Sequence, residues 1–286
     1  MNRTRIAAIF DVDGTLIAGD SMERIFFRFL WRRGELGWKD LGNFAVGILE
    51  ALSKGRRPLK SNKYYLRGKD AAKLRRLARE CFEQEITPIL EANAISRLHW
   101  HQNAGHFVVL LSGTFDLLLE PLAEYLGVSA RIGTELEVVG RRLTGRIAGR
   151  HPYGRAKAEC LTVMNRLGLF NLKRSFAYAD SYADRHLLAA VGNPVAINAD
   201  LRLQRLAEIE GWMTEHFTQS NYELRNNKSA EYCRQINTRI YHLHDNADPG
   251  LPSEYQPLGS PPTNTLRADC NGDRIGLCAN RQNKRA

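Results

Sequence analysis

Two aspartates separated by one residue, Asp11 and Asp13, follow directly after the apolar run Ile6–Phe10. Such a run predicts a buried β-strand, and residues i and i+2 of a strand point to the same side. Gly14 then lets the chain turn away from the strand, because glycine has no Cβ. We therefore expect both carboxylates to face one pocket at the carboxyl end of the strand, where open α/β sheets bind ligands.

Further groups that could bind an anion or a metal stand at or just beyond the ends of later predicted elements. They are Ser112 with Gly113, Lys157, and Asp180 with Asp184. Each alone has an ordinary structural explanation, as a turn, an exposed helix residue or a helix cap. In this order along one chain, they supply what phosphoryl transfer requires: a nucleophile, a proton donor and positive charge on the phosphate oxygens.

The first aspartate can attack phosphorus and form an aspartyl-phosphate, so Asp11 is the candidate nucleophile. Asp13 can protonate the leaving alcohol and then take a proton from the water that hydrolyses the intermediate. Lys157 adds a positive charge against the phosphate. The Ser112 hydroxyl and the Gly113 N–H can donate hydrogen bonds to phosphate oxygens.

Carboxylates next to a phosphate concentrate negative charge, so a divalent cation is expected in the same pocket. Carboxylate oxygens suit Mg²⁺. Asp180 and Asp184 would complete its coordination, directly or through water. The sequence therefore predicts a Mg²⁺-dependent phosphomonoester hydrolase.

The elements that must position these residues alternate between strand and helix. Strands are predicted over 5–10, 107–111, 175–179 and 194–197, and helices over 115–126, 156–167 and 201–209, with a short hairpin over 135–147. Such alternation indicates an α/β fold, a doubly wound and mostly parallel sheet with a Rossmann-like core.

A long helical pattern separates the first two strands. We expect residues 1–19 and 90–217 to form the core and residues 20–89 an inserted, all-helical cap. Residues 218–286 are rich in Asn, Ser, Pro and Arg and have no sustained apolar period, which predicts a disordered or loosely structured tail.

The formal net charge is +10, and the segment Lys54–Arg79 alone holds 11 basic residues and one acid. Such a segment either attracts anions or forms a solvated helical face. Its only aromatic residues are Tyr64 and Tyr65, so no nucleic-acid partner is expected. No apolar run approaches the roughly 20 residues that a membrane-spanning helix needs, so a cytoplasmic protein is predicted.

As a set, these residues resemble the four motifs of the haloacid dehalogenase superfamily of phosphohydrolases, over roughly residues 5–212. The motifs read Asp11-Val12-Asp13-Gly14-Thr15, Ser112-Gly113-Thr114, Lys157 and Asp180-Ser181-Tyr182-Ala183-Asp184. The helical insertion is similar to the cap of the phosphoserine-phosphatase-like branch. The resemblance implies that Asp11 is the nucleophile, that Asp13 is the acid/base and lends a carbonyl to Mg²⁺, and that Asp180 binds the metal.

The chain also departs from that branch, which leaves its substrate open. Ser181 and Ala183 replace a Gly and an Asn of the fourth motif, and Asp20 stands where the cap has a Glu for the substrate amino group. Asp20 is therefore a candidate substrate-binding residue. We expect a small phosphorylated metabolite as substrate. The alternatives are an anionic lipid head group of the phosphatidylglycerophosphate type, a phosphotransferase reaction, and a non-catalytic phosphate-binding regulatory module.

Overall fold

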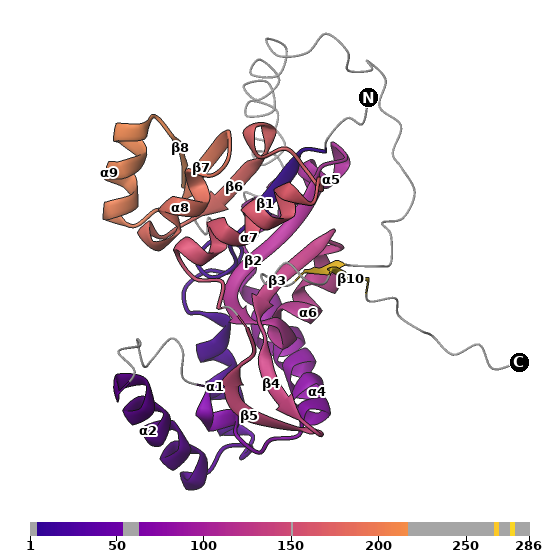
Figure 1. Ribbon diagram of the computed structural model, residues 1–286, viewed down its shortest axis with the longest axis vertical. Helices are drawn as coiled ribbons and strands as arrows, with labels where there is room; N and C mark the ends of the chain where they lie inside the picture. Colours follow the sequence, from indigo (N-terminus) through magenta and orange to yellow (C-terminus); the bar gives the residue numbers. More distant parts are fainter. Residues whose placement is uncertain (1–4, 54–62, 150, 217–265, 269–274, 278–286) are drawn as a thin grey trace, which may run out of the picture.

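A computed structural model describes residues 5–53, 63–149, 151–216, 266–268 and 275–277 (Figure 1). Its main sheet has the strand order β10-β9-β3-β2-β1-β6-β7-β8, and the six strands from β3 to β8 in this order are parallel. Their bounds are Ala130–Thr134 (β3), Phe107–Phe115 (β2), Ala7–Phe10 (β1), Phe176–Ala179 (β6), Asn193–Ile197 (β7) and Met213–Glu215 (β8).

Helices cover both faces of this sheet, because its central strands are apolar on both sides. Phe10 belongs to the apolar cluster of one face and Ile9 to that of the other. Helices α5 (Ala92–Asn103) and α6 (Asp116–Leu126) cover the face of Phe10, and helices α7 (Arg155–Arg166), α8 (Arg185–Leu188) and α9 (Leu201–Glu210) cover that of Ile9. The predicted doubly wound, mostly parallel sheet is therefore confirmed.

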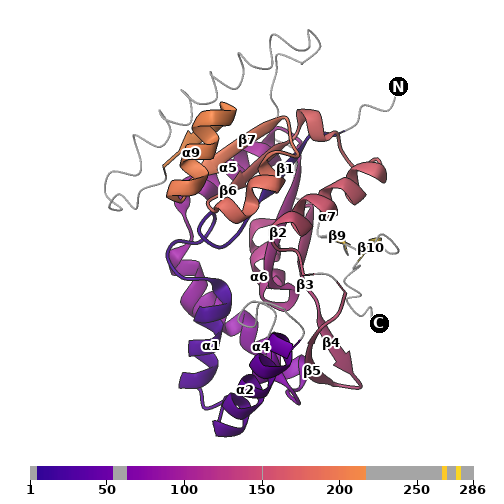
Figure 2. The same ribbon diagram turned by 60° about the vertical axis from the view of Figure 1, so that its left-hand side comes forward.

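The segment between β1 and α5 forms the cap, which lies at the end of the molecule away from α9 (Figures 1 and 2). Its elements are α1 (Met22–Arg32), α2 (Trp38–Ser53), η1 (Tyr64–Leu66), α4 (Ala71–Cys81), η2 (Phe82–Ile86) and η3 (Thr87–Ile89). Helix α1 turns one apolar side inward, and Phe26, Phe29 and Leu30 are buried there. Their i, i+3 and i+4 spacing is typical of an amphipathic helix.

A hairpin that follows β3 in the sequence packs against the cap. Its strands are β4 (Leu136–Val139) and β5 (Arg142–Ile147), close to the predicted bounds. The Gly68 N–H donates to the Leu143 carbonyl at 2.7 Å, and the Leu143 N–H donates to the Lys69 carbonyl at 2.9 Å. The helical cap is thus extended by two strands that lie far from it in the sequence.

Two short strands of the C-terminal segment extend the sheet beyond β3. Strand β9 (Leu266–Ala268) pairs in parallel with β3, and β10 (Ile275–Leu277) pairs antiparallel with β9. The sequence pattern predicts neither strand. The rest of the predicted tail lies outside the described residues.

Much of the basic segment Lys54–Arg79 is paired with acids where the structure describes it. The pairs are Lys63–Glu23, Lys69–Asp40, Lys73–Glu35, Arg75–Glu120 and Arg79–Glu124. They join cap elements to one another and to α6, so these side chains have a structural role. Residues 54–62 lie outside the described part. Within the described ranges, no helix has the length and apolar character needed to cross a bilayer.

Candidate active site

The predicted site residues surround one cavity of about 930 Å³ at the carboxyl ends of β1, β2 and β6. Asp11 follows β1, and Ser112 and Gly113 lie near the end of β2. The other predicted residues come from the loop between β1 and α1, from α7 and from the segment after β6. The cavity wall includes all eight of them: Asp11, Asp13, Asp20, Ser112, Gly113, Lys157, Asp180 and Asp184. Parallel strands place their carboxyl ends at one edge, which is why distant sequence positions meet here.

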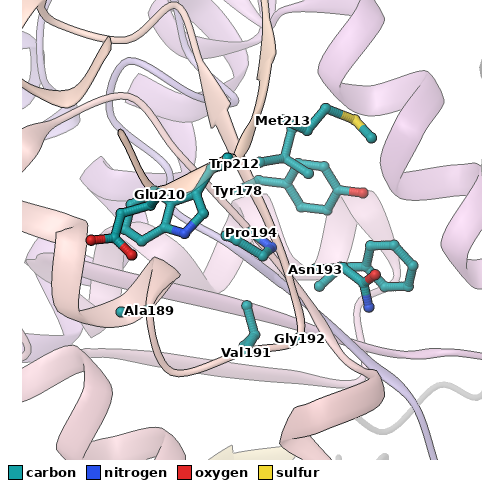
Figure 3. A pocket seen from close by; sticks show the side chains of 12 residues that line it. Tyr178, Ala189, Val191, Gly192, Asn193, Pro194, Glu210, Trp212 and Met213 are labelled. Atoms are coloured by element: carbon teal, nitrogen blue, oxygen red, sulfur yellow. The ribbon is translucent and has the colours of Figure 1, made fainter. Parts of the chain in front are cut away.

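A smaller cavity of about 460 Å³ lies at the amino ends of β6, β7 and β8 (Figure 3). Tyr178, Trp212, Met213 and Pro194 line much of it, and Glu210 stands at its edge. None of the predicted site residues reaches it. The chemistry of this chain is therefore to be sought in the larger cavity.

Lys157 is buried between two aspartates of the larger cavity. Its Nζ lies 2.8 Å from Asp11 Oδ1 and 2.7 Å from Asp184 Oδ2. Burial alone would lower the pKa of Lys157, but the two carboxylates outweigh it and raise the pKa, so the ammonium stays charged. Burial raises the pKa of Asp11 well above its usual value, and Lys157 opposes that rise. A single cation thus holds the candidate nucleophile in place.

Three carboxylates could hold a metal ion in this cavity. Oxygens of Asp11, Asp180 and Asp184 lie within 4.8 Å of one another. Asp184 Oδ1 is buried and accepts no hydrogen bond from the described residues. Burial, together with the nearby Asp184, raises the pKa of Asp180 to about 6. An orphaned oxygen and crowded carboxylates fit a hard divalent cation such as Mg²⁺.

Gly14 allows Asp180 to approach the first motif. Its φ of +80° is a conformation that other residues rarely adopt, and a Cβ at this position would lie 2.1 Å from Asp180 Oδ2. Any other residue at position 14 would displace Asp180 or the backbone. The glycine of the first motif is therefore needed for the geometry of the fourth.

The side chain of Asp13 lies apart from the three-carboxylate cluster. Its Oδ1 accepts a hydrogen bond from the Met22 N–H at 2.8 Å, at the start of α1, and its Oδ2 accepts one from the Thr114 hydroxyl at 2.9 Å. Burial raises the pKa of Asp13, although both hydrogen bonds oppose the rise. A carboxyl group held here with a raised pKa suits proton exchange better than metal binding through the side chain.

Two other predicted residues are engaged within the protein. The Ser112 Oγ accepts a hydrogen bond from the Thr114 N–H at 3.1 Å. Asp20 accepts from Arg24 at 3.2 Å and also from Arg28. Although partial burial alone would raise the pKa of Asp20, Arg28 and the other hydrogen-bond donors lower it. Asp20 thus reaches the cavity as a carboxylate already neutralised by arginines.

A partly buried ion pair on the cap side of the cavity was not predicted from the sequence. Lys63, which precedes η1, pairs with Glu23 of α1, and its Nζ lies 4.7 Å from the centre of the Phe115 ring. Both charged residues line the cavity. Glu23 follows Asp20 by three positions, so helical spacing would have placed it on the same face. No sequence signal links it to Lys63.

Asp200, which holds the loop that carries Asp180 and Asp184, was also not predicted from the sequence. Its N–H donates to the Asp180 carbonyl at 2.9 Å, and its Oδ2 accepts from the Tyr182 N–H at 2.8 Å. Its Oδ1 accepts from two N–H groups at the start of α9. Asp200 therefore fixes the loop to the helix end that it caps.

The raised pKa of Asp180 predicts a pH-dependent response to Mg²⁺. Its carboxyl group titrates near 3.8 when unfolded and at about 6 when folded, so without metal its contribution to stability falls as the pH rises through this window. We expect excess Mg²⁺ to raise the Tm by several degrees at about pH 7.5 and by much less at about pH 5, where protons compete for the carboxylates. Thermal unfolding at both pH values, with Mg²⁺ or chelator, measures this.

Asp180→Asn is the matched variant for that experiment. Because it removes one buried charge, it should unfold without metal at a Tm equal to or above that of wild type, and it should lose most of the Mg²⁺-induced shift. An equal Mg²⁺-induced shift at both pH values, or a full shift in the variant, would contradict the metal assignment.

Comparisons with known proteins show the family of this chain. A family model for haloacid dehalogenase-like hydrolases matches residues 8–189. Phosphoserine phosphatase SerB1 of Mycobacterium tuberculosis is 35% identical over 222 residues, covering 74% of this chain and 70% of that protein. Histidinol-phosphatase of Neisseria meningitidis is 28% identical, covering 73% of this chain and 98% of that protein. A Bordetella pertussis protein of unknown function is similar in structure, with a TM-score of 0.63 and 27% identity, covering 75% of this chain and all of that one.

Proposed function

The chain belongs to the haloacid dehalogenase-like hydrolases and is a phosphatase, and we propose that it hydrolyses small phosphomonoesters through an aspartyl-phosphate on Asp11. The observation that carries the proposal is the position of Lys157, which pairs with both Asp11 and Asp184 beside the three-carboxylate cluster. A nucleophile, a fixed positive charge and a set of metal ligands thus share one cavity.

The proposed reaction has two displacements at phosphorus. In the first, an Asp11 carboxylate oxygen bonds to phosphorus, the ester P–O bond breaks, and Asp13 gives its proton to the leaving oxygen. In the second, Asp13 takes a proton from water, whose oxygen bonds to phosphorus as the bond to Asp11 breaks. Lys157 attracts the phosphate oxygens in both steps. Mg²⁺ held by Asp11, Asp180 and Asp184, with the Asp13 carbonyl, would neutralise negative charge during the reaction.

The cap side of the cavity suggests the kind of leaving group. Glu23, Lys63 and Arg24 present charges of both signs, and Phe27 and Tyr65 present aromatic surface. Such a wall suits a small polar alcohol that bears an amino group, because Glu23, whose Oε2 pairs with Lys63, can offer its Oε1 to the ammonium while the rings exclude water. The names of the phosphoserine and histidinol phosphatase relatives are consistent with substrates of this kind.

Phosphate release from a panel of monoesters tests the proposal. The panel contains phosphoserine, histidinol phosphate, phosphocholine, a sugar phosphate and phosphatidylglycerophosphate, each with Mg²⁺ and with chelator. We expect release that needs Mg²⁺ and is fastest for one of the small amino-bearing esters. Added alcohol distinguishes hydrolysis from phosphoryl transfer.

Three results would contradict parts of the proposal. Full activity with chelator would exclude a requirement for Mg²⁺. Fastest release from phosphatidylglycerophosphate would exclude a small metabolite as the preferred substrate. No phosphate release from any ester would favour a non-catalytic phosphate-binding regulatory module.

A further inference from the structure

Helix α2 of the cap has an apolar outer face. Its exposed positions include Trp38 at 84%, Val46 at 53%, Leu49 at 68% and Leu52 at 58% of full exposure. Together with the exposed Gly42 and Ala45, they recur every three or four residues, so they form one continuous stripe along the helix. A helix in water normally turns such a stripe to the core and keeps polar residues outside. Among the residues that the structure describes, none covers this stripe fully.

The inner face of α2 is already occupied within the cap. Phe44 lies edge-on to the Tyr65 ring, with centroids 6.1 Å apart, and it also lines the active-site cavity. Asp40 is buried and pairs with Lys69 at 2.8 Å. The outer stripe therefore cannot turn inward without breaking these contacts. Figures 1 and 2 show α2 at the outer end of the cap, away from the sheet.

We propose that the outer stripe of α2, from Trp38 to Leu52, docks on an anionic lipid surface. A helix that lies in the membrane interface needs an apolar face with aromatic residues and positive charge to attract anionic lipids. Trp38 and the neighbouring Trp31, 6.4 Å apart and edge to face, supply aromatic rings at one end of the stripe. The exposed Lys39 stands beside them, and the whole chain carries a net charge of +10.

The size of the stripe and the net charge of the chain favour a membrane over a second copy of the chain. A helix of 16 residues is about 24 Å long, so one face of it covers roughly 300 Å². A stable protein interface needs about 800 Å² on each partner. Two copies that each carry +10 would also repel one another, whereas an anionic lipid surface attracts the chain. Docking through α2 would bring the active-site cavity, which Phe44 lines, close to the membrane.

Co-sedimentation of the full-length protein with vesicles tests this proposal. One set contains phosphatidylglycerol and phosphatidylcholine, and the other contains phosphatidylcholine alone. We expect binding to the anionic vesicles that weakens with salt, and a loss of about tenfold or more in Leu49→Glu, which puts a charge in the middle of the stripe. Ile209→Glu, at a similarly exposed apolar residue of α9 far from the cap, is the matched control and should bind like wild type.

Three results would overturn the proposal. The first is the absence of wild-type binding to anionic vesicles, and the second is equal binding by Leu49→Glu and wild type. The third is a wild-type dimer in gel filtration that Leu49→Glu converts to a monomer, which would make a second copy the partner of the stripe. Circular dichroism of both variants checks that they are folded. Vesicle binding and gel filtration are read without any phosphatase assay, so their outcomes are independent of the proposed activity.

Discussion

Asp11→Asn should lower phosphate release by about four orders of magnitude while the protein stays folded. An amide oxygen is a poor nucleophile, so the aspartyl-phosphate cannot form at a useful rate. The substitution keeps the shape of the side chain, and Lys157 retains its partner Asp184 at 2.7 Å. Steady-state phosphate release with Mg²⁺, together with the Tm, measures both parts of this expectation.

A second Asp→Asn substitution provides the control. Asp70 does not line the cavity. It caps α4 by accepting a hydrogen bond from the Lys73 N–H, and asparagine caps helices equally well. Asp70→Asn should therefore keep activity within about twofold of wild type. Wild-type turnover by Asp11→Asn would exclude the nucleophilic role and leave Asp11 as a metal ligand at most.

Lys157→Gln should cost both stability and activity. It leaves Asp11 and Asp184 buried without their common cation, and breaking a buried ion pair in this way costs about 3–5 kcal/mol. For a protein of this size, the Tm should fall on the order of 10 °C. Activity should also fall by at least about a hundredfold, because the phosphate loses a fixed positive charge.

The dependence of the Tm on Mg²⁺ and on pH distinguishes an electrostatic cause of the lost stability from a packing defect. Excess Mg²⁺ should restore part of the Tm of Lys157→Gln, because a cation at the three carboxylates replaces the lost charge. Acidification should also reduce the difference in Tm between Lys157→Gln and wild type, because burial and the neighbouring carboxylates raise the pKa of Asp11. Protonation of that group removes a buried charge. A Tm unchanged by the substitution would show that another cation balances these aspartates.

The sequence predicts the catalytic half of the cavity because its signals are local. Each motif stands at the end of a short apolar run, as with Asp11 after β1 and Asp180 after β6, and parallel strands bring such ends together. The helix from Asp116 to Leu126 and its end at the left-handed Gly127 also follow from local rules. For these elements, composition and spacing determine the structure.

The cap half of the cavity depends on contacts between distant residues. Glu23 and Lys63 lie 40 positions apart, and neither belongs to a motif. Strand β9 pairs with β3 across more than a hundred residues of sequence. The basic segment illustrates the same limit, since its charge is visible in the sequence but its partners, such as Glu124 for Arg79, are not. Contacts between residues that are far apart in the sequence therefore cannot be predicted from this sequence alone.

The packing of the β4–β5 hairpin on the cap determines how the cavity can open. A cap that contacted only its own chain segment would be joined to the sheet by two chain connections and could rotate about them. Here the Gly68, Lys69 and Leu143 backbone bonds tie it to the hairpin, and Gly145 packs where a Cβ would lie 2.8 Å from Tyr64 Cα. Because these contacts join the cap to the hairpin, any movement of the cap relative to the sheet would carry the hairpin with it. Such a movement would bend the chain at four connections: before α1, before α5, before β4 and after β5.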